Sequence, residues 1–501
     1  MHMPDANPLS EPAAPYDVLI IGAGISGIGC ACYLQREAPD KRWAILEARD
    51  SLGGTWDLFK YPGIRSDSDL YTFSYDFKPW TSANSIAPAD EIMGYLREAA
   101  AEHSVDQRIS YGRQVVTAEW DSSEALWRVT ARNNKTGTNE TYRCRWLFGA
   151  TGYYDYDEGF RPQFIDEDLF KGPIIHPQFW PDDFDYTGKR IAIIGSGATA
   201  VTLLPSLTDK ASHVIQVQRT PTYIMPRPQH DPVALWLKRW LPAKTAYALT
   251  RWKNTRIQWL FYRFCQKYPN RARKLIRRMN EKRLPAGYPV DLHFNPPYNP
   301  WDQRLCAVPD SDYFNDISAG KASIETGHID RFTPSGIKMT SGEQIDADAI
   351  IVATGLKIKM MGGVRITIDG ADIDVSERLV YKGMMLDSVP NFAFATGYTN
   401  SSWTLKVGLV CKHFCKILAE MDRLQVDVCT PVKPDGGVEK RPLLDFDAGY
   451  VKRAFDEMPK QGDRYPWRLS ESYISDLRLF KREDVHDPAL KFTKAAQGAA
   501  K

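Results

Sequence analysis

The sequence predicts an α/β protein built from two Rossmann-like dinucleotide-binding domains with an α-helical insertion. Two glycine-rich motifs carry this prediction, one starting at Gly22 and one at Gly195. Each follows a short apolar run and precedes a helical stretch, which is the context in which such a turn binds a dinucleotide. The third observation is a basic, aromatic segment at residues 226–322, where tryptophans recur at helical spacing.

Length and composition agree with a large globular fold. A chain of 501 residues accommodates two or three domains, and its net charge of +2 argues against bulk nucleic-acid binding. No run of about 18 apolar residues is present, so no membrane span is expected. Residues 1–15 resemble a loose tail without an export signal, and we expect a cytoplasmic protein. The eight cysteines include no C-x-x-C pair, which argues against a disulfide reductase and favours buried thiols.

The first nucleotide-binding unit begins with a short, largely apolar run rich in β-branched residues at 16–21 and has a second strand at 42–47. Between these strands Gly22 is expected to form the tight turn, and Gly24 to let the backbone approach a pyrophosphate. Gly27 is expected to permit close packing of the following helix against the strand.

The helix after this turn is expected over residues 28–36. Its N-terminus offers unpaired N–H groups and a partial positive charge to phosphates, and Ser26 lies in this phosphate-binding turn. Glu47, at the tip of the second strand, is placed to accept hydrogen bonds from ribose hydroxyls.

The second unit repeats this pattern with strands at residues 189–194 and 213–218. Its expected cofactor-binding turn consists of Gly195, Ser196, Gly197, Ala198, Thr199 and Ala200. The second strand ends in Arg219 and Thr220, where the first unit has an acid. A guanidinium there can bind the 2′-phosphate of NADP, whereas a carboxylate would repel it. The alternative is that Arg219 is a solvated cation at a strand end.

The second strand ends in an acid in the first unit and in a basic residue in the second unit. This difference indicates that FAD and NADPH/NADP+ bind to the same chain. The sequence Ala-Thr-Gly follows an apolar strand twice, at residues 150–152 and 353–355, and marks the expected crossovers between domains. The expected limits are 16–150 and 386–501 for the FAD-binding domain, 151–225 and 323–385 for the NADP-binding domain, and 226–322 for the helical insertion.

A motif in the linker between the two units is more specific than the glycine turns. Residues 170–181 match F-x-G-x-x-x-H-x-x-x-W-P at all six fixed positions. The match resembles the fingerprint of type I Baeyer–Villiger monooxygenases, which belong to the flavin-containing monooxygenase superfamily. The blocks at residues 295–309, 381–386, 396–405 and 459–469 resemble the ethionamide-activating subgroup of these enzymes.

The resemblance implies further site residues. A second family pattern covers Gly53, Gly54, Thr55, Trp56, Arg65, Ser66 and Asp67, and Val115 is placed with these cofactor-binding residues. Asp67 is the expected catalytic carboxylate beside the flavin, although a turn or N-cap role would also suit the Ser-Asp-Ser-Asp segment. Arg304 is the expected catalytic arginine, because a fixed guanidinium stabilises negative charge that develops on oxygen. Many family members carry Lys where this chain has Gln303.

The activity implied by the resemblance is conversion of ketones to esters or lactones through a peroxyflavin, with NADPH and O2 consumed. The subgroup also implies oxygenation of sulfides and thioamides. The alternative enzyme is a flavin-containing N/S-monooxygenase, and the alternative outside enzymes is a membrane-associating nucleotide-binding protein. The histidines lack metal-ligand spacing, so no metal is expected.

Three other residues invite functional assignments. His176 lies in the linker and is interpreted as a structural residue, with direct catalysis as the alternative. Trp403 and Trp467 could line the cofactor or substrate site, but isolated tryptophans are more often core residues.

The helical insertion carries fifteen Lys or Arg residues between Pro228 and Arg283, against Asp231 and Glu281. Interleaved with them are Trp236, Trp240, Trp252, Trp259, Phe261 and Phe264. Such a region can lie on an anionic inner membrane surface. The alternative is that the aromatic side chains cover the substrate cavity while the cations face water.

Overall fold

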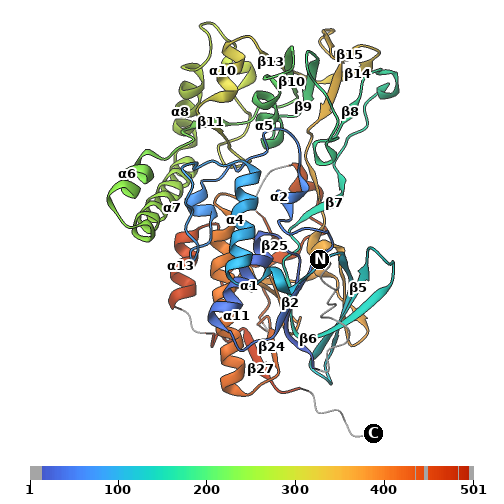
Figure 1. Cartoon of the computed structure of the whole chain (residues 1–501), viewed down its shortest axis with the longest axis vertical. Helices are drawn as coiled ribbons and strands as arrows, with labels where there is room; N and C mark the ends of the chain where they lie inside the picture. The colour runs from blue at the N-terminus through green and yellow to red at the C-terminus, as the bar shows by residue number, and fades with distance from the viewer. Residues whose placement is uncertain (1–13, 435, 445–448, 483–484, 496–501) are drawn as a thin grey trace, which may run out of the picture.

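The computed structural model describes residues 14–434, 436–444, 449–482 and 485–495. Two sheets lie at opposite ends of the long axis of the molecule, the first in the lower half and the second in the upper half (Figure 1). The two expected dinucleotide-binding units are therefore present. Most of the expected tail, residues 1–13, lies outside the described residues.

The first sheet is nine-stranded, with the order β20-β19-β4-β5-β6-β1-β2-β3 and β23 beside β6. Its strands are β1 (Tyr16–Ile21), β2 (Trp43–Leu46), β3 (Ile109–Ser110), β4 (Arg113–Asp121), β5 (Leu126–Asn133), β6 (Asn139–Gly149), β19 (Arg365–Ile368), β20 (Ala371–Asp372) and β23 (Phe392–Phe394). The central strand β1 pairs in parallel with β2 and β6. Parallel strands are covered on both faces, which explains why β2 and the part of β1 from Val18 onward are continuous apolar runs.

Three helices pack together in the core cluster on one face of this sheet (Figure 1): α1 (Ile25–Glu37), α4 (Ala89–Glu102) and α11 (Trp403–Leu424). The helix α1 begins at Ile25, three residues before the expected start. Gly24 has an extended backbone and caps this helix without a side-chain hydrogen bond, so the first N–H groups lie directly beyond β1. Two short helices, α2 (Thr55–Leu58) and α3 (Leu70–Phe73), follow in the same unit.

The second sheet is five-stranded, with the order β13-β10-β9-β17-β8 and parallel pairing throughout. Its strands are β8 (Ile174–Ile175), β9 (Arg190–Ile194), β10 (His213–Gln218), β13 (Ala322–Thr326) and β17 (Ala349–Val352), with α5 (Ala198–Leu207) after β9. An antiparallel ribbon of β14 (Ile329–Thr333), β15 (Gly336–Met339) and β16 (Gln344–Asp346) follows β13. The strand–turn–helix–strand order of the second unit is confirmed.

The chain crosses between the units where the two Ala-Thr-Gly sequences lie. The segments that follow them, β7 (Tyr154–Gly159) and β18 (Leu356–Ile358), pair antiparallel beside each other. Beyond β18, strand β19 pairs with β4 of the first sheet. Residues 365–372, which were expected in the NADP-binding domain, therefore extend the first sheet, because the return crossover is complete at β18. The other domain limits stay predictions.

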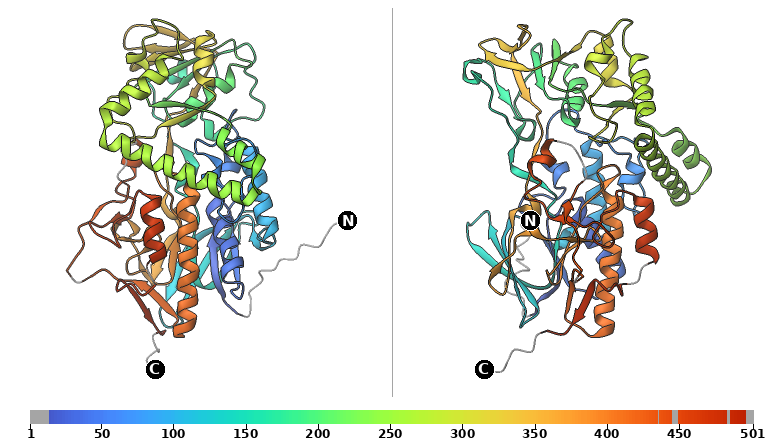
Figure 2. Two further views of the ribbon diagram at one scale, coloured as in Figure 1. Left: turned by 90° about the vertical axis from the view of Figure 1, so that its left-hand side faces the viewer. Right: turned by 180° about the vertical axis from the view of Figure 1, so that it is seen from behind.

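The insertion is helical, as expected. It contains α6 (Pro232–Trp240), α7 (Ala243–Lys267), α8 (Pro269–Glu281) and α9 (Val290–His293). The carboxylate of Asp231 caps α6 by accepting from the N–H groups of Val233 and Ala234, and a proline begins α8. The hairpin of α6 and α7 projects from the body of the molecule (Figures 1 and 2). A parallel ribbon of β11 (Ile224–Arg227) and β12 (Cys306–Pro309) flanks the insertion, followed by α10 (Asp312–Ser318).

The C-terminal part completes the first unit. It contributes β21 (Val380–Tyr381), β22 (Met385–Leu386), β24 (Val428–Pro431), β25 (Arg441–Pro442), α12 (Gly449–Arg453), β26 (Lys460–Gln461), α13 (Tyr473–Arg482) and β27 (Leu490–Thr493). All eight cysteine side chains are buried and none forms a disulfide. None of the helices in the described ranges combines the length and apolar composition needed to cross a bilayer.

Candidate cofactor and active site

A cavity of about 620 Å³ lies between the two units. It brings together most of the residues expected to bind cofactor or act in catalysis: Gly22, Gly24, Ser26, Glu47, Gly53, Gly54, Thr55, Trp56, Arg65, Ser66, Asp67, Val115, Ala198, Thr199 and Arg304. Residues from the first unit, α5 of the second unit and the C-terminal part share this wall. A ligand in the cavity would contact all three regions at once.

The glycine turn after β1 leaves no room for side chains. Gly22 has φ +101°, and a Cβ atom there would lie 2.7 Å from the carbonyl oxygen of Ala150. A Cβ atom on Gly27 would lie 1.9 Å from the oxygen of Gly22, so the helix approaches the strand as closely as backbone permits. Gly27 itself does not line the cavity; its role here is the packing of α1.

Glu47 holds the tip of β2 against this turn. Its carboxylate accepts hydrogen bonds from the N–H groups of Ala23, at 2.6 Å, and Arg49, at 2.9 Å. Burial raises its pKa, and the two N–H donors oppose that shift. Each carboxylate oxygen has further lone pairs, so the expected ribose contact stays a prediction that this geometry allows.

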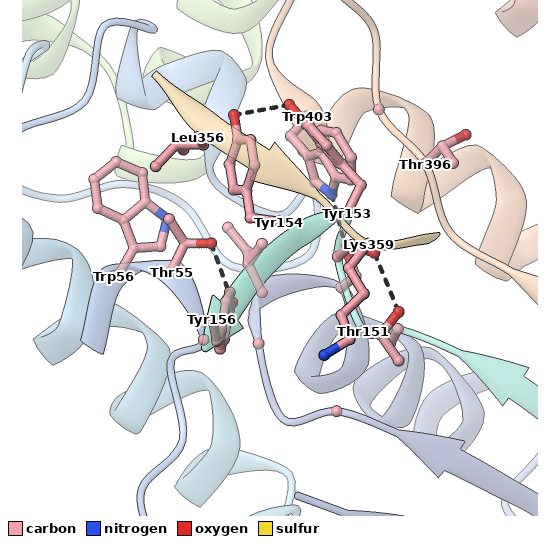
Figure 3. A pocket seen from close by; sticks show the side chains of 18 of the residues that line it. Thr55, Trp56, Thr151, Tyr153, Tyr154, Tyr156, Leu356, Lys359, Thr396 and Trp403 are labelled. Atoms are coloured by element: carbon pink, nitrogen blue, oxygen red, sulfur yellow. Dashed lines mark hydrogen bonds between the residues drawn. The ribbon is translucent and has the colours of Figure 1, made fainter. Parts of the chain in front are cut away.

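Gly53 and Gly54 bring a second loop against the first turn. Both have positive φ, +116° and +57°, and a Cβ atom on Gly54 would lie 3.0 Å from the Cα of Gly24. The next residue, Thr55, shares a hydrogen bond of 3.2 Å with the hydroxyl of Tyr156 on β7 (Figure 3). Trp56 packs edge-on against Phe73 and lines the cavity. The loop therefore closes one side of the cavity with backbone and an aromatic face.

Asp67 and Arg304 form an ion pair in the cavity wall, with 2.9 Å between Arg304 Nε and Asp67 Oδ2. The side chains are 41% and 28% exposed, so both present polar surface to the cavity. The Asp67 carboxylate raises the pKa of Arg304, which keeps the guanidinium charged. The N-cap role is taken by Asp69, which accepts from the N–H of Tyr71 at the start of α3. The capping alternative for Asp67 is therefore wrong.

Aromatic side chains build the opposite wall. The rings of Tyr153 and Trp403 stack with centroids 5.3 Å apart, and the Trp403 indole donates to the Ser26 hydroxyl at 2.8 Å (Figure 3). The hydroxyls of Tyr153 and Tyr154 share a hydrogen bond of 3.0 Å. Trp403 thus lines the site, whereas Trp467 is 1% exposed, lies in the core and does not line the cavity.

Sequence reasoning missed several lining residues. Tyr153, Tyr154, Tyr156, Lys359 and Tyr450 line the cavity. A signal for the first three was present, because they directly follow the crossover sequence at residues 150–152. Lys359 follows the second crossover in the same way, whereas nothing in the sequence distinguishes Tyr450 from other tyrosines.

Six residues expected to bind the second cofactor lie outside this cavity: Gly195, Ser196, Gly197, Ala200, Arg219 and Thr220. They lie at the ends of β9 and β10 and at the start of α5, where the Ser196 hydroxyl donates to the Thr220 carbonyl at 2.7 Å. Nothing lies within 4 Å of a Cβ atom built on Gly197, so this backbone faces open space. Arg219 is exposed and has no hydrogen bond or ion pair within the described ranges.

Arg65 connects the units. Its Nη1 donates to Asp312 Oδ2 of α10 at 2.5 Å, while its buried Nη2 has no hydrogen-bond partner within the described part of the chain. The residue lines the cavity, so its expected cofactor contact stays a prediction. Its observed role is to connect the first unit to the region beyond β12.

His176 lies away from the cavity, beside the crossover. Its Nδ1 accepts from the N–H of Gln178 at 3.3 Å, and a Cβ atom on Gly159 would lie 2.1 Å from its ring. Burial lowers its pKa, which favours the neutral ring. These contacts fit the structural interpretation of the linker histidine.

Known families match both parts of this architecture. Residues 20–83 match the NAD(P)-binding Rossmann-like domain family, and residues 79–281 match the L-lysine 6-monooxygenase/L-ornithine 5-monooxygenase family. FAD-containing monooxygenase EthA of Mycobacterium tuberculosis is 49% identical over 479 residues, covering 95% of this chain and 98% of that protein. The corresponding protein of Mycolicibacterium smegmatis is 48% identical over 480 residues, covering 96% and 97%.

Solved structures show the same fold. Oxidised steroid monooxygenase bound to NADP has a TM-score of 0.74 and 20% identity, with coverage of 96% of this chain and 100% of that one. Cyclohexanone monooxygenase from Rhodococcus sp. Phi1 bound to NADP+ has a TM-score of 0.72 and 18% identity, with the same coverage. The arrangement of two dinucleotide-binding units therefore recurs at low sequence identity.

Proposed function

Because the chain belongs to the family of FAD-containing monooxygenases represented by EthA, we propose that it inserts one oxygen atom beside a ketone carbonyl. The products are esters or lactones. One O2, one NADPH and one proton are consumed; one oxygen atom enters the substrate, the other leaves as water, and NADP+ is formed. The same enzyme oxygenates sulfides and thioamides.

The residues of the first unit fit FAD. Gly22, Gly24 and Gly54 line this cavity with backbone, a Cβ atom on Gly22 would clash with Ala150, and the N-terminus of α1 opens onto the same cavity. Such a surface suits a pyrophosphate. The cavity volume of about 620 Å³ falls in the usual range for ligand sites.

The second unit fits NADPH. The N-terminus of α5 has no side-chain cap, and Ser196, two residues before α5, binds the carbonyl of Thr220, the residue after Arg219. Arg219 itself has no ion pair among the described residues.

The Asp67–Arg304 pair is the observation that carries the proposed chemistry. FAD, when bound, supplies oxygen activation, and NADPH supplies two electrons as a hydride. Oxygen insertion places negative charge on the former carbonyl oxygen, and the Arg304 guanidinium stabilises that charge. Asp67 fixes the orientation of Arg304 through the 2.9 Å contact. The aromatic wall of Tyr153 and Trp403 excludes water from the same space.

The test is oxygen-dependent oxidation of NADPH with product identification. Purified protein is supplied with ¹⁸O₂, NADPH and a panel of aliphatic ketones, a thioether, a thioamide and an amine. Mass spectrometry should find one ¹⁸O atom per product. The variant Arg304→Ala should retain FAD but form ester about 100-fold more slowly, the usual scale for loss of a fixed charge-stabilising donor. NADPH consumption that yields only hydrogen peroxide with every substrate would refute the proposal. Products from amines and sulfides alone would favour an N/S-monooxygenase.

We also propose that the α6–α7 hairpin, residues 232–267, contacts an anionic inner membrane surface. Most of the large apolar side chains that are exposed in the described residues lie between Val233 and Leu275. Trp236, Trp240 and Trp252 are 62%, 65% and 56% exposed. Arg256 lies over the Trp252 ring at 4.0 Å, so cationic and aromatic surface occur together. Tryptophan beside arginine suits the headgroup region of a bilayer.

Vesicle binding tests this membrane contact. Wild-type protein should co-sediment with anionic vesicles at low salt and not with zwitterionic ones.

A further inference from the structure

A second cavity, of about 50 Å³, adjoins the main one at the Asp67–Arg304 pair. Six residues line both cavities: Asp67, Ser68, Arg304, Ala307, Thr399 and Ser401. A molecule that reacts beside Arg304 can therefore extend one end into this smaller space. One water molecule needs about 10–15 Å³ on this measure, so the space holds a group of a few heavy atoms.

One face of the β11–β12 ribbon forms the floor of this cavity. Met225 pairs with Ala307 in the parallel register, and Arg227 follows two positions along β11 on the same face. These three side chains line the cavity, whereas Ile224 and Val308 on the other face pack into the core of the second unit. Helix α7 contributes the apolar Phe261 and the polar Gln258, which close the cavity from the insertion side.

The backbone carbonyl of Arg227 accepts a hydrogen bond from the N–H of Asp310. The Arg227 side chain, in contrast, has no hydrogen bond or ion pair anywhere in the described part of the chain. Burial lowers the pKa of its guanidinium, while Asp69 and Asp67 act in the opposite direction. Both carboxylates already have donors of their own. Arg304 binds Asp67, and the backbone N–H of Tyr71 and the Thr72 hydroxyl bind Asp69. The guanidinium therefore presents five unused N–H donors at a cavity.

Arg251 shows what a structural arginine in this protein does instead. Its Nη1 donates to the carbonyl oxygens of Tyr71, Thr72 and Ser74, and it lines neither cavity. Arg227 makes no such contacts, so fold stability does not explain its position.

A second, independent observation marks the same cavity. Trp301 has φ +76°, a conformation that bulky residues adopt rarely and that is often found at binding sites. It lines the cavity, and its buried indole Nε1 has no hydrogen-bond partner among the residues that the structure describes. Two neighbouring side chains thus carry unused donors, since buried donors are normally paired.

We infer that this second cavity is a substrate subsite for a carboxylate, and that Arg227 selects oxo acids over neutral ketones. A guanidinium binds a carboxylate through two parallel hydrogen bonds, which matches both the unused donors and the small volume. Met225, Leu305 and Phe261 suit the methylene chain between the carboxylate and the reacting carbonyl. The inference rests on the proposed oxygenation of ketones and names a class of substrate for it.

The experiment compares 6-oxoheptanoate with heptan-2-one, which differ by a carboxylate in place of a terminal methyl. Wild-type enzyme should show a kcat/KM at least about tenfold higher for the acid, the usual scale for a hydrogen-bonded ion pair. Arg227→Met should bring the ratio of the two values to about one. Arg227→Lys, which lacks the two-pronged donor, should give an intermediate ratio. Arg251→Met, the matched control, should lower thermal stability and leave the ratio as in wild type.

Binding is measured separately with hexanoate, which has no ketone and is not turned over. Calorimetry on the FAD-loaded protein should detect hexanoate binding in wild type and not in Arg227→Met, with hexan-1-ol as the neutral control. If heptan-2-one is oxygenated but the wild-type ratio is near one and hexanoate does not bind, the subsite is refuted while the proposed function stands. If hexanoate binds through Arg227 but no ketone or sulfur compound of the panel is oxygenated, the proposed function fails and the subsite stands. A raised KM for NADPH in Arg227→Met, with the acid preference unchanged, would assign Arg227 to coenzyme binding and overturn the inference.

Discussion

Neighbouring carboxylates in one short segment have different roles in this protein. In the Ser-Asp-Ser-Asp stretch, either acid suits a helix cap by sequence alone, because caps are recognised by residue type. The structure gives the cap to Asp69 and the arginine contact to Asp67. The sequence predicted that Asp67 and Arg304 belong to one site, through family motifs 237 residues apart in the chain. It could not predict their 2.9 Å contact, because that distance depends on how β12 packs.

Substitutions at these two acids should therefore have separate effects. Asp67→Ala removes the partner that orients Arg304, so kcat for ketone oxygenation should fall about 10- to 100-fold, because catalytic groups tolerate little misplacement. Asp69→Ala removes a helix cap and should cost about 1 kcal/mol of unfolding free energy. Turnover rates and denaturant unfolding of both variants check this. Equal loss of turnover in the two variants would contradict the assignment.

Arg219 tests the coenzyme preference. Its guanidinium is exposed and unpaired within the described ranges, at the end of β10 beside the open turn of α5. If it binds the 2′-phosphate, Arg219→Ala should raise KM for NADPH about 10- to 100-fold and leave that for NADH nearly unchanged. Arg190→Ala, at the opposite end of the adjacent strand β9, serves as the control. Equal losses with both coenzymes would show that Arg219 does not recognise the phosphate.

His413 makes stability depend on pH. Burial, together with Lys382 and Lys416, lowers its pKa from 6.5 to about 3, and neither ring nitrogen has a hydrogen-bond partner in the described segments. Between pH 6.5 and about pH 3, His413 is protonated in the unfolded chain but neutral in the folded chain. The free energy of unfolding therefore falls by about 1.4 kcal/mol for each pH unit over this range. His413→Leu should therefore raise Tm more at pH 5 than at pH 8. The same difference in Tm at both pH values would contradict this.

At the scale of elements, a helix or strand could be predicted from the sequence where several local signals agree. The helices after Gly24 and Gly197 were predicted, because the glycine turn, the apolar strand before it and the helical run after it agree. The β11–β12 ribbon was not predicted. Prolines at 226 and 228 argue against a strand, and the partner strand lies some 80 residues later in the sequence. The second cavity depends on that ribbon, so sequence reasoning could not have found it.

The α6–α7 hairpin was predicted to be helical and basic, but only the structure shows which of its aromatic side chains are exposed. Trp240 and Trp252 are exposed, whereas Trp259 and Phe261 are partly buried. The double variant Trp240→Ser/Trp252→Ser should weaken co-sedimentation with anionic vesicles about 10-fold or more, because each ring loses its interfacial contact.

Two controls make the vesicle measurement specific. Ile165→Ser removes an apolar side chain of 59% exposure outside the hairpin and should bind vesicles as wild type does. High salt should weaken binding of the wild type by screening the cations. Of the cations, Arg277 is a poor choice for charge reversal, since it pairs with Asp291 and Glu281. No vesicle binding by wild type at low salt would leave the hairpin as a solvated wall of the insertion.

At the scale of the whole molecule, the two-unit architecture was predicted from paired motifs, whereas the boundary between the units was misplaced at residues 365–372. Long-range pairing of β19 with β4 joins residues about 250 positions apart. Local periodicity carries no information on such pairing, because strands of either sheet have the same period of two.

FAD should hold the whole molecule together, because its expected cavity is lined by both units and the C-terminal part. Purified protein should be yellow, with about one non-covalent FAD per chain. A ligand at 100 times its Kd adds about 2.7 kcal/mol of stability, so Tm should rise with added FAD. Differential scanning fluorimetry with flavin absorbance measures both quantities.

Gly22→Val provides the decisive variant for this prediction. Its side chain would clash with the Ala150 carbonyl at a backbone φ of +101°, so the variant should lose both the flavin and the rise of Tm with FAD. Gly137→Ala carries a similar backbone penalty, with φ +74°, in the turn between β5 and β6, where nothing lies within 4 Å of the added Cβ. It should keep the flavin. If the wild-type protein is colourless and its Tm does not change with added FAD, the assignment of the first unit to FAD binding is contradicted, because its glycine turn would then hold no dinucleotide.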